Sequence, residues 1–174
     1  MVITGGMVVN FHDITKENML NGSGLRTVLW VSGCEQHCPN CQNPQTHPKD
    51  SGIPFDEEAE KELFESLKPD YIAGLTVTGG HPLEEYNYSE VLRLCKKCKQ
   101  LFPNKTIWVY TGYTWEHVKD LTIMKYIDVL CDGRFVEELK DNTLRWIGSS
   151  NQNVIDVQKS LEAGKIILYC KQEK

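Results

Sequence analysis

Short β-branched and aromatic runs alternate along this chain with stretches whose apolar residues recur every three or four positions. The runs predict strands at 26–31, 71–78, 106–110 and 126–131. The stretches between them predict amphipathic helices, because apolar residues at this spacing line one helix face. These helices are expected at 55–67, 91–101 and 114–121. Strands that alternate with helices are typical of βαβ units, so we expect a parallel sheet with helices outside it.

The length of the chain limits how far such a sheet can extend. A complete eight-stranded α/β barrel takes about 250 residues, whereas this chain has 174. We therefore predict an α/β fold with a partial, incomplete TIM-type barrel of parallel strands and outer helices. We expect a single domain over residues 1–174, with a core at 22–152 and an irregular tail at 153–174. Two short strands are expected in that tail, at 153–159 and 165–169.

Composition and charge exclude several classes of protein. The formal net charge is -5 and no lysine or arginine run is interleaved with aromatic residues, so we expect no nucleic-acid partner. No stretch approaches the roughly twenty apolar residues that cross a bilayer, so we expect no membrane association. The seven cysteines are an odd number, and no apolar secretory segment is expected. These features predict reduced thiols in a cytoplasmic protein rather than a disulfide framework.

Three cysteines crowd into eight residues after the first predicted strand. Cys34, Cys38 and Cys41 form a C-x3-C-x2-C loop. Thiolates hold iron-sulfur clusters, and a cubane cluster normally takes four of them. Three local thiolates would leave one iron open, and a small molecule can coordinate and be activated at such a position. The loop therefore predicts a cluster whose fourth partner is a ligand.

Two other interpretations of the cysteines are open. His37 and His47 could complete a zinc site with the same thiolates, although zinc ligands usually come as two separated pairs. Cys95 and Cys98 form a C-x2-C pair, which can be redox-active. Both lie on the apolar stripe of the helix predicted at 91–101, which favours their burial as small apolar residues.

The turns after the predicted strands carry residues suited to bind a ligand. In parallel α/β folds, ligands bind at the carboxyl ends of the strands. These ends hold the cysteine loop and three pairs: Gly79 with Gly80, Thr111 with Gly112, and Asp132 with Gly133. We expect the four turns to converge on one site.

The order of these motifs resembles that of the radical S-adenosylmethionine superfamily, in which a C-x3-C-x2-C loop after one strand precedes a Gly-Gly turn after the next. The segment N-G-S-G-L-R-T-V-L-W-V-S-G-C at 21–34 is similar to the glycine-rich lead-in of glycyl-radical-enzyme activases. Four further segments are similar to those of anaerobic ribonucleotide reductase activating proteins: T-G-G-H-P at 78–82, Y-T-G-Y at 110–113, D-G-R at 132–134 and G-S-S-N-Q at 148–152. The resemblance covers residues 22–152.

The resemblance implies a radical S-adenosylmethionine fold and a 4Fe-4S cluster held by Cys34, Cys38 and Cys41, with S-adenosyl-L-methionine chelated at the open iron. It implies reductive cleavage of the sulfonium to methionine and a 5'-deoxyadenosyl radical, which abstracts hydrogen from a glycine of the anaerobic ribonucleoside-triphosphate reductase. The chain is then an activating enzyme, a radical S-adenosylmethionine oxidoreductase. A reduced flavodoxin-like electron donor, and a homodimer or a complex with the reductase, are implied as further partners.

The same resemblance implies roles at the Gly-Gly turn. Gly79 and Gly80 have no side chains, so their backbone can approach the methionyl amino group of the ligand closely. His81 stands where the family usually has an acidic residue. A neutral imidazole can accept a hydrogen bond from the ammonium group through one nitrogen only, and a protonated one cannot accept at all. We therefore expect backbone carbonyls to contribute most of the binding.

Three polar residues are weaker candidates. Asn43 lies two positions after Cys41, where the family often has asparagine, and it is expected to brace the loop by bonding backbone. Asp132 and Arg134 follow a predicted strand and could contact the ribose or carboxylate of the ligand, or pair with each other.

Two alternative functions remain open from the sequence. One is activation of another glycyl radical enzyme, such as pyruvate formate-lyase, although those activases usually have a longer barrel. The other is a non-catalytic zinc or iron-sulfur module. An electron carrier would be expected to show a fourth cluster cysteine at regular local spacing, and none of the other four cysteines has it.

Overall fold

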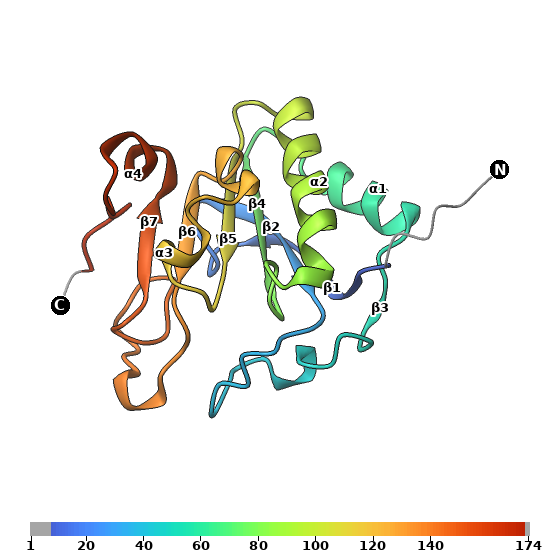
Figure 1. The fold of residues 1–174 in the computed structure, drawn as a ribbon. Helices are drawn as coiled ribbons and strands as arrows, with labels where there is room; N and C mark the ends of the chain where they lie inside the picture. Colours follow the sequence, from blue (N-terminus) through green and yellow to red (C-terminus); the bar gives the residue numbers. More distant parts are fainter. Residues whose placement is uncertain (1–7, 173–174) are drawn as a thin grey trace.

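The computed structural model describes residues 8–172, and its centre is one open sheet of seven strands (Figure 1). The strands are β1 (Asn10–Asn18), β2 (Leu25–Val31), β3 (Ile53–Pro54), β4 (Ile72–Gly79), β5 (Thr106–Tyr110), β6 (Val129–Asp132) and β7 (Asn153–Asp156). Their order in the sheet is β3-β1-β2-β4-β5-β6-β7. The four strands from β2 to β6 in this order are parallel, as predicted, whereas β1, β3 and β7 pair antiparallel with their neighbours. The sheet does not close on itself, because β3 and β7 are its two edges.

In the described part of the chain, four α-helices accompany the sheet: α1 (Glu57–Ser66), α2 (Glu85–Leu101), α3 (Trp115–Val118) and α4 (Val157–Ala163). Three short 3-10 helices lie at Pro44–Thr46, Thr122–Lys125 and Glu137–Leu139. The predictions of α1, α2 and the four parallel strands are confirmed. α1 begins where the Asp56 side chain accepts a hydrogen bond from the Ala59 amide, which caps the helix. The helix expected at 114–121 is shorter than predicted, since it ends at Val118.

The tail predictions are partly wrong. The strand expected at 153–159 ends at Asp156, because the Asp156 carboxylate accepts a hydrogen bond from the Lys159 amide and caps α4 instead. The segment at 165–169 is not a strand, and Leu168 forms only an isolated bridge with Ile155. β1 and β3 were not predicted at all. The sheet therefore extends past both ends of the core expected at 22–152.

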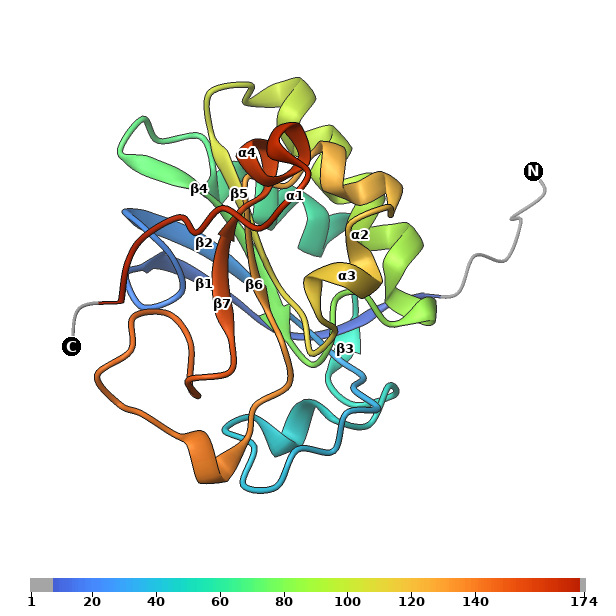
Figure 2. The same ribbon diagram turned by 60° about the vertical axis from the view of Figure 1, so that its left-hand side comes forward.

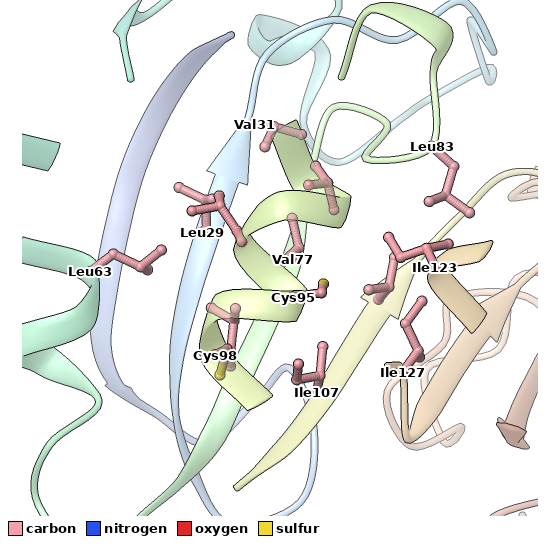
Figure 3. Packing of buried hydrophobic residues seen from close by; sticks show 14 of the residues in the cluster. Leu29, Val31, Leu63, Val77, Leu83, Cys95, Cys98, Ile107, Ile123 and Ile127 are labelled. Atoms are coloured by element: carbon pink, nitrogen blue, oxygen red, sulfur yellow. The ribbon is translucent and has the colours of Figure 1, made fainter. Parts of the chain in front are cut away.

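The two faces of the sheet differ in chemistry. Alternate residues of the strands, such as Leu29, Val77 and Ile107, point to the face that α2 covers (Figure 3). Cys95 and Cys98 of α2 are fully buried in this layer, which confirms their interpretation as core residues. The opposite face carries a second, smaller apolar cluster: Trp108, Val129, Cys131 and Val154.

A buried cation lies among the polar residues of that second face. The guanidinium of Arg26 is fully buried and lies over the ring of Trp108. It donates five hydrogen bonds to neutral acceptors, among them the Thr76 hydroxyl and the Thr106 carbonyl. Its role is to join β2, β4 and β5 through these bonds.

The loops that follow the parallel strands gather at one end of the sheet. The loop at 32–52 and the segment at 133–152 both lie at this end in two views that differ by 60° (Figures 1 and 2). Among residues 8–172, no helix has the length and apolar character needed to cross a membrane.

Candidate iron-sulfur site

The cysteine loop is held at its base by the segment that returns to the sheet. The Gly33 amide donates to the Thr46 carbonyl at 2.7 Å, and the Cys34 amide donates to the His47 carbonyl at 2.9 Å. The Ser32 hydroxyl donates to the Ser51 carbonyl at 2.8 Å. These bonds join both arms of the loop, so the position of Cys34 is fixed relative to the end of β2.

The three thiols are half-buried and are supported by backbone groups. The Cys41 amide donates to the Cys38 carbonyl at 3.2 Å. The Asn43 amide lies 3.4 Å from Cys41 Sγ, and hydrogen bonds of this kind to a cluster sulfur tune its reduction potential. The Asn43 carbonyl accepts from the Thr46 hydroxyl at 2.7 Å. Asn43 thus braces the loop with its own backbone, whereas the prediction concerned its side chain.

Burial raises the pKa of the Cys34 thiol to about 11, and the nearby Glu84, Cys38 and Cys41 add to the shift. The thiol therefore holds its proton at neutral pH in the metal-free protein. Iron that binds here must displace that proton, because the thiolate is the ligand.

The Gly-Gly turn packs directly against the base of the cysteine loop. The Gly80 amide donates to the Val31 carbonyl and the His81 amide to the Gly33 carbonyl, each at 2.7 Å. A Cβ atom at Gly80 would lie 2.5 Å from the Gly33 carbonyl oxygen, and Gly79 has a φ of +103°. Glycine is required here by the close approach of two strand ends, in addition to any approach of a ligand.

His81 is a buried residue whose two ring nitrogens both have protein partners. Nδ1 lies 2.8 Å from Glu84 Oε1, and Nε2 lies 2.7 Å from Thr111 Oγ1. The Gly112 amide also donates to Nε2 at 3.2 Å. Burial lowers the pKa of His81, and the hydrogen bond that His81 donates to Glu84 opposes that shift. Both ring nitrogens of the imidazole are therefore engaged within the protein, and His81 also lines the cavity described below.

A cavity of about 480 Å³ lies where the strand ends meet. Its volume falls in the range of roughly 300–1,000 Å³ that is usual for small-molecule sites. Its walls include each turn that was expected to converge there: Cys34, Cys38, Cys41, Gly79, Gly80, Thr111, Gly112 and Gly133. The predicted convergence of the four turns is confirmed.

Asp132 and Arg134 lie beside the cavity but do not line it. Asp132 is 2% exposed, and its carboxylate accepts hydrogen bonds from the amides of Trp115 and Asn153. It thereby fixes the start of α3 and the start of β7. The Arg134 guanidinium donates to the His37 carbonyl at 3.3 Å. The two side chains have these partners rather than each other.

Comparison with known proteins extends the description of this site. The family model described as "4Fe-4S single cluster domain" matches residues 20–155. Relatives that share most of the chain are anaerobic ribonucleoside-triphosphate reductase-activating proteins. The chain belongs to this family.

Three members show the extent of the similarity. The protein from Escherichia coli K12 is 38% identical over 150 residues, which are 84% of this chain and 97% of the relative. The protein from Enterobacteria phage T4 is 40% identical over 146 residues, 84% of this chain and 93% of the relative. The protein from Pasteurella multocida is 40% identical over 150 residues, 83% of this chain and 95% of the relative. These relatives favour a reductase-activating protein over an activase of pyruvate formate-lyase.

The three thiols suit the cluster named in the family model, because thiolates are the ligands that hold iron-sulfur clusters. In a cubane cluster each thiolate binds a different iron. The donor set of this family member therefore suits a 4Fe-4S cluster.

Several residues of the site were missed in the sequence. Trp30, Gln36 and Trp146 line the cavity. Trp30 could have been found, because it alternates with the core residues of β2 and must face the opposite side of the sheet. The others lie on loops whose course no periodic pattern reveals.

Proposed function

We propose that this protein activates an anaerobic ribonucleoside-triphosphate reductase by generating a glycyl radical on it. The proposal is carried by one observation: three cysteines, one short of the usual set, line the same cavity as a glycine turn that exposes backbone. A cluster held by Cys34, Cys38 and Cys41 would supply an electron for reductive cleavage of S-adenosyl-L-methionine to a 5'-deoxyadenosyl radical. The cavity that these cysteines line is large enough for a small molecule, which could bind beside the cluster.

The chain's own residues would hold, orient and shield these groups. The backbone of Gly79 and Gly80 would bind the methionyl end of the ligand, and the engaged imidazole of His81 would leave that contact to the backbone. The aromatic walls at Trp30 and Trp146 would limit access of water. The ligand contacts predicted for Asp132 and Arg134 are not included in this proposal, because their polar atoms have other partners.

The wider setting of the reaction also belongs to the proposal. We regard the open sheet as the partial barrel of the radical S-adenosylmethionine superfamily. Its unclosed edge would admit a glycine-bearing loop of the folded reductase. A flavodoxin-like donor would supply the electron, and the protein would act as a homodimer or in complex with the reductase. A reducing cytoplasm would keep the thiols available for iron.

Anaerobic reconstitution with iron and sulfide tests the proposal. The protein should then contain about four irons per chain, and after reduction it should convert S-adenosyl-L-methionine to methionine and 5'-deoxyadenosine. Cys38→Ala should abolish both properties. Cys95→Ala is the matched control, because this thiol is buried in the core, and it should retain them. Bound zinc without iron, or no cleavage by the iron-loaded parent, would refute the proposal.

A further inference from the structure

A buried carboxylate joins three of the turns that surround the cavity. Glu84 stands at the N-cap position of α2, but its side chain makes no capping bond and is only 6% exposed as a residue. Oε1 accepts from the Glu35 amide at 3.2 Å and lies 2.8 Å from His81 Nδ1. Oε2 accepts from the Tyr113 hydroxyl at 3.3 Å. One side chain therefore connects the cysteine loop, the Gly-Gly turn and the turn after β5.

The donors around this network define where its protons lie. The Gly112 amide can only donate, so His81 Nε2 must offer a lone pair to it. His81 is then a neutral imidazole that carries its proton on Nδ1 and donates it to Glu84. All three groups that face the Glu84 oxygens can donate, namely an amide, an imidazole N–H and a phenol. This arrangement is the one expected for an ionised carboxylate.

No cation balances this carboxylate among residues 8–172. The one potential ion-pair partner within 4.0 Å of Glu84 there is His81, which the hydrogen bonds assign as neutral. The negative charge lies beside the first cluster ligand, because Glu35 directly follows Cys34. A negative charge near a cluster opposes the addition of an electron and so lowers the reduction potential.

We propose that Glu84 is a positioning residue that fixes the Cys34 end of the cysteine loop against the Gly79 and Gly80 turn and, by its charge, lowers the reduction potential of the bound cluster. A more negative potential makes the reduced cluster a stronger reductant toward the sulfonium of the ligand. This inference deepens the proposed function and rests on it, because it concerns the cluster of that same site. Glu84 acts through the loop and does not line the cavity.

The substitution Glu84→Gln tests the effect of the negative charge while it keeps the size and shape of the side chain. Glutamine keeps an oxygen that can accept from Glu35 and His81, but it removes the negative charge. Glu85→Gln is the matched control, because Glu85 is the neighbouring carboxylate and is exposed. Each variant is reconstituted anaerobically, and its midpoint potential is measured by spectroelectrochemical titration. We expect a more positive potential for Glu84→Gln and the parent's potential for Glu85→Gln.

A second variant covers the case in which Glu84→Gln does not fold, as judged by circular dichroism. Tyr113→Phe removes one donor to the carboxylate and leaves the charge in place. In the presence of an iron chelator, it should lose its cluster faster than the parent does. Its midpoint potential should not shift to a more positive value. A positive shift in Tyr113→Phe, or an unshifted potential in folded Glu84→Gln, would overturn the inference alone. A parent that takes up no iron would overturn the proposed function and this inference with it.

Discussion

The substitution Gly80→Ala tests whether the base of the cysteine loop depends on close contact between two turns. The added Cβ would lie 2.5 Å from the Gly33 carbonyl oxygen and 3.0 Å from the Gly33 amide nitrogen, whereas ordinary contact begins at 3.4 Å. Both of these atoms belong to backbone, so no side chain can rotate to make room. The two turns must therefore separate by about 0.9 Å, the difference between 3.4 and 2.5 Å.

That separation weakens two short hydrogen bonds, from the Gly80 amide to Val31 and from the His81 amide to Gly33. Each is worth about 0.5–1.5 kcal/mol net, and overpacking a tight site costs about 1–3 kcal/mol. We expect Gly80→Ala to lower the free energy of unfolding by about 2–4 kcal/mol in urea titrations. Because Gly33 precedes Cys34, the variant should also bind less iron on reconstitution.

A glycine far from the site provides the control. Gly164 has a φ of +65° and no atom within 4 Å of an added Cβ, so Gly164→Ala adds backbone strain of about 1–2 kcal/mol without a collision. It should destabilise the protein and still bind the parent's amount of iron. If Gly80→Ala unfolds at the parent's urea concentration and binds as much iron as Gly164→Ala, the reasoning about the two turns is wrong.

Three further predictions concern stability. Asp56→Ala removes the cap of α1 and should cost about 0.5–2 kcal/mol in urea unfolding, whereas Glu57→Ala should cost less; equal losses would contradict the capping role. Arg26→Met removes five hydrogen bonds from buried and part-buried acceptors and should cost at least about 2 kcal/mol, while Arg93→Met, at the surface, should cost under about 1 kcal/mol. The pKa of His81 is lower in the folded protein than the unfolded value of about 6.5, so the unfolded chain binds more protons and stability falls as pH drops below about 6.5. Metal-free protein should therefore lose more stability between pH 7.5 and about 5.5 than His81→Gln, and equal losses would show that His81 does not titrate in this way.

The parallel centre of the fold could be predicted because its signals are local. β2, β4 and β5 are runs of buried residues, and α1 and α2 repeat apolar residues on one face. β1 gave no such signal, because only Phe11 and Ile14 are buried along it and its pairing with β2 contains irregularities. The first three residues of α4, 157–159, were predicted as the end of a strand, because the seven residues of this helix are too few for a clear helical period.

The candidate site also contains some features that could be predicted from the sequence and others that could not. The three cysteines and the Gly-Gly turn are contiguous motifs, so their place in one cavity could be predicted from the sequence. The reason for glycine at position 80 could not, since it depends on Gly33, which is distant in sequence. Glu84 was missed for a similar reason, because its partners Glu35 and Tyr113 come from other strand ends. Its spacing of three residues from His81 was the one local sign of the pair.

The central claim is that the site makes a radical on a glycine of the reductase. The most direct measurement is electron paramagnetic resonance of the reductase polypeptide after anaerobic incubation with reduced, reconstituted protein and S-adenosyl-L-methionine. We predict a glycyl radical signal that loses its α-proton splitting when the reductase contains glycine deuterated at the α-carbon, and no signal with Cys38→Ala. The account is contradicted if the iron-loaded protein cleaves S-adenosyl-L-methionine while the reductase remains without a radical.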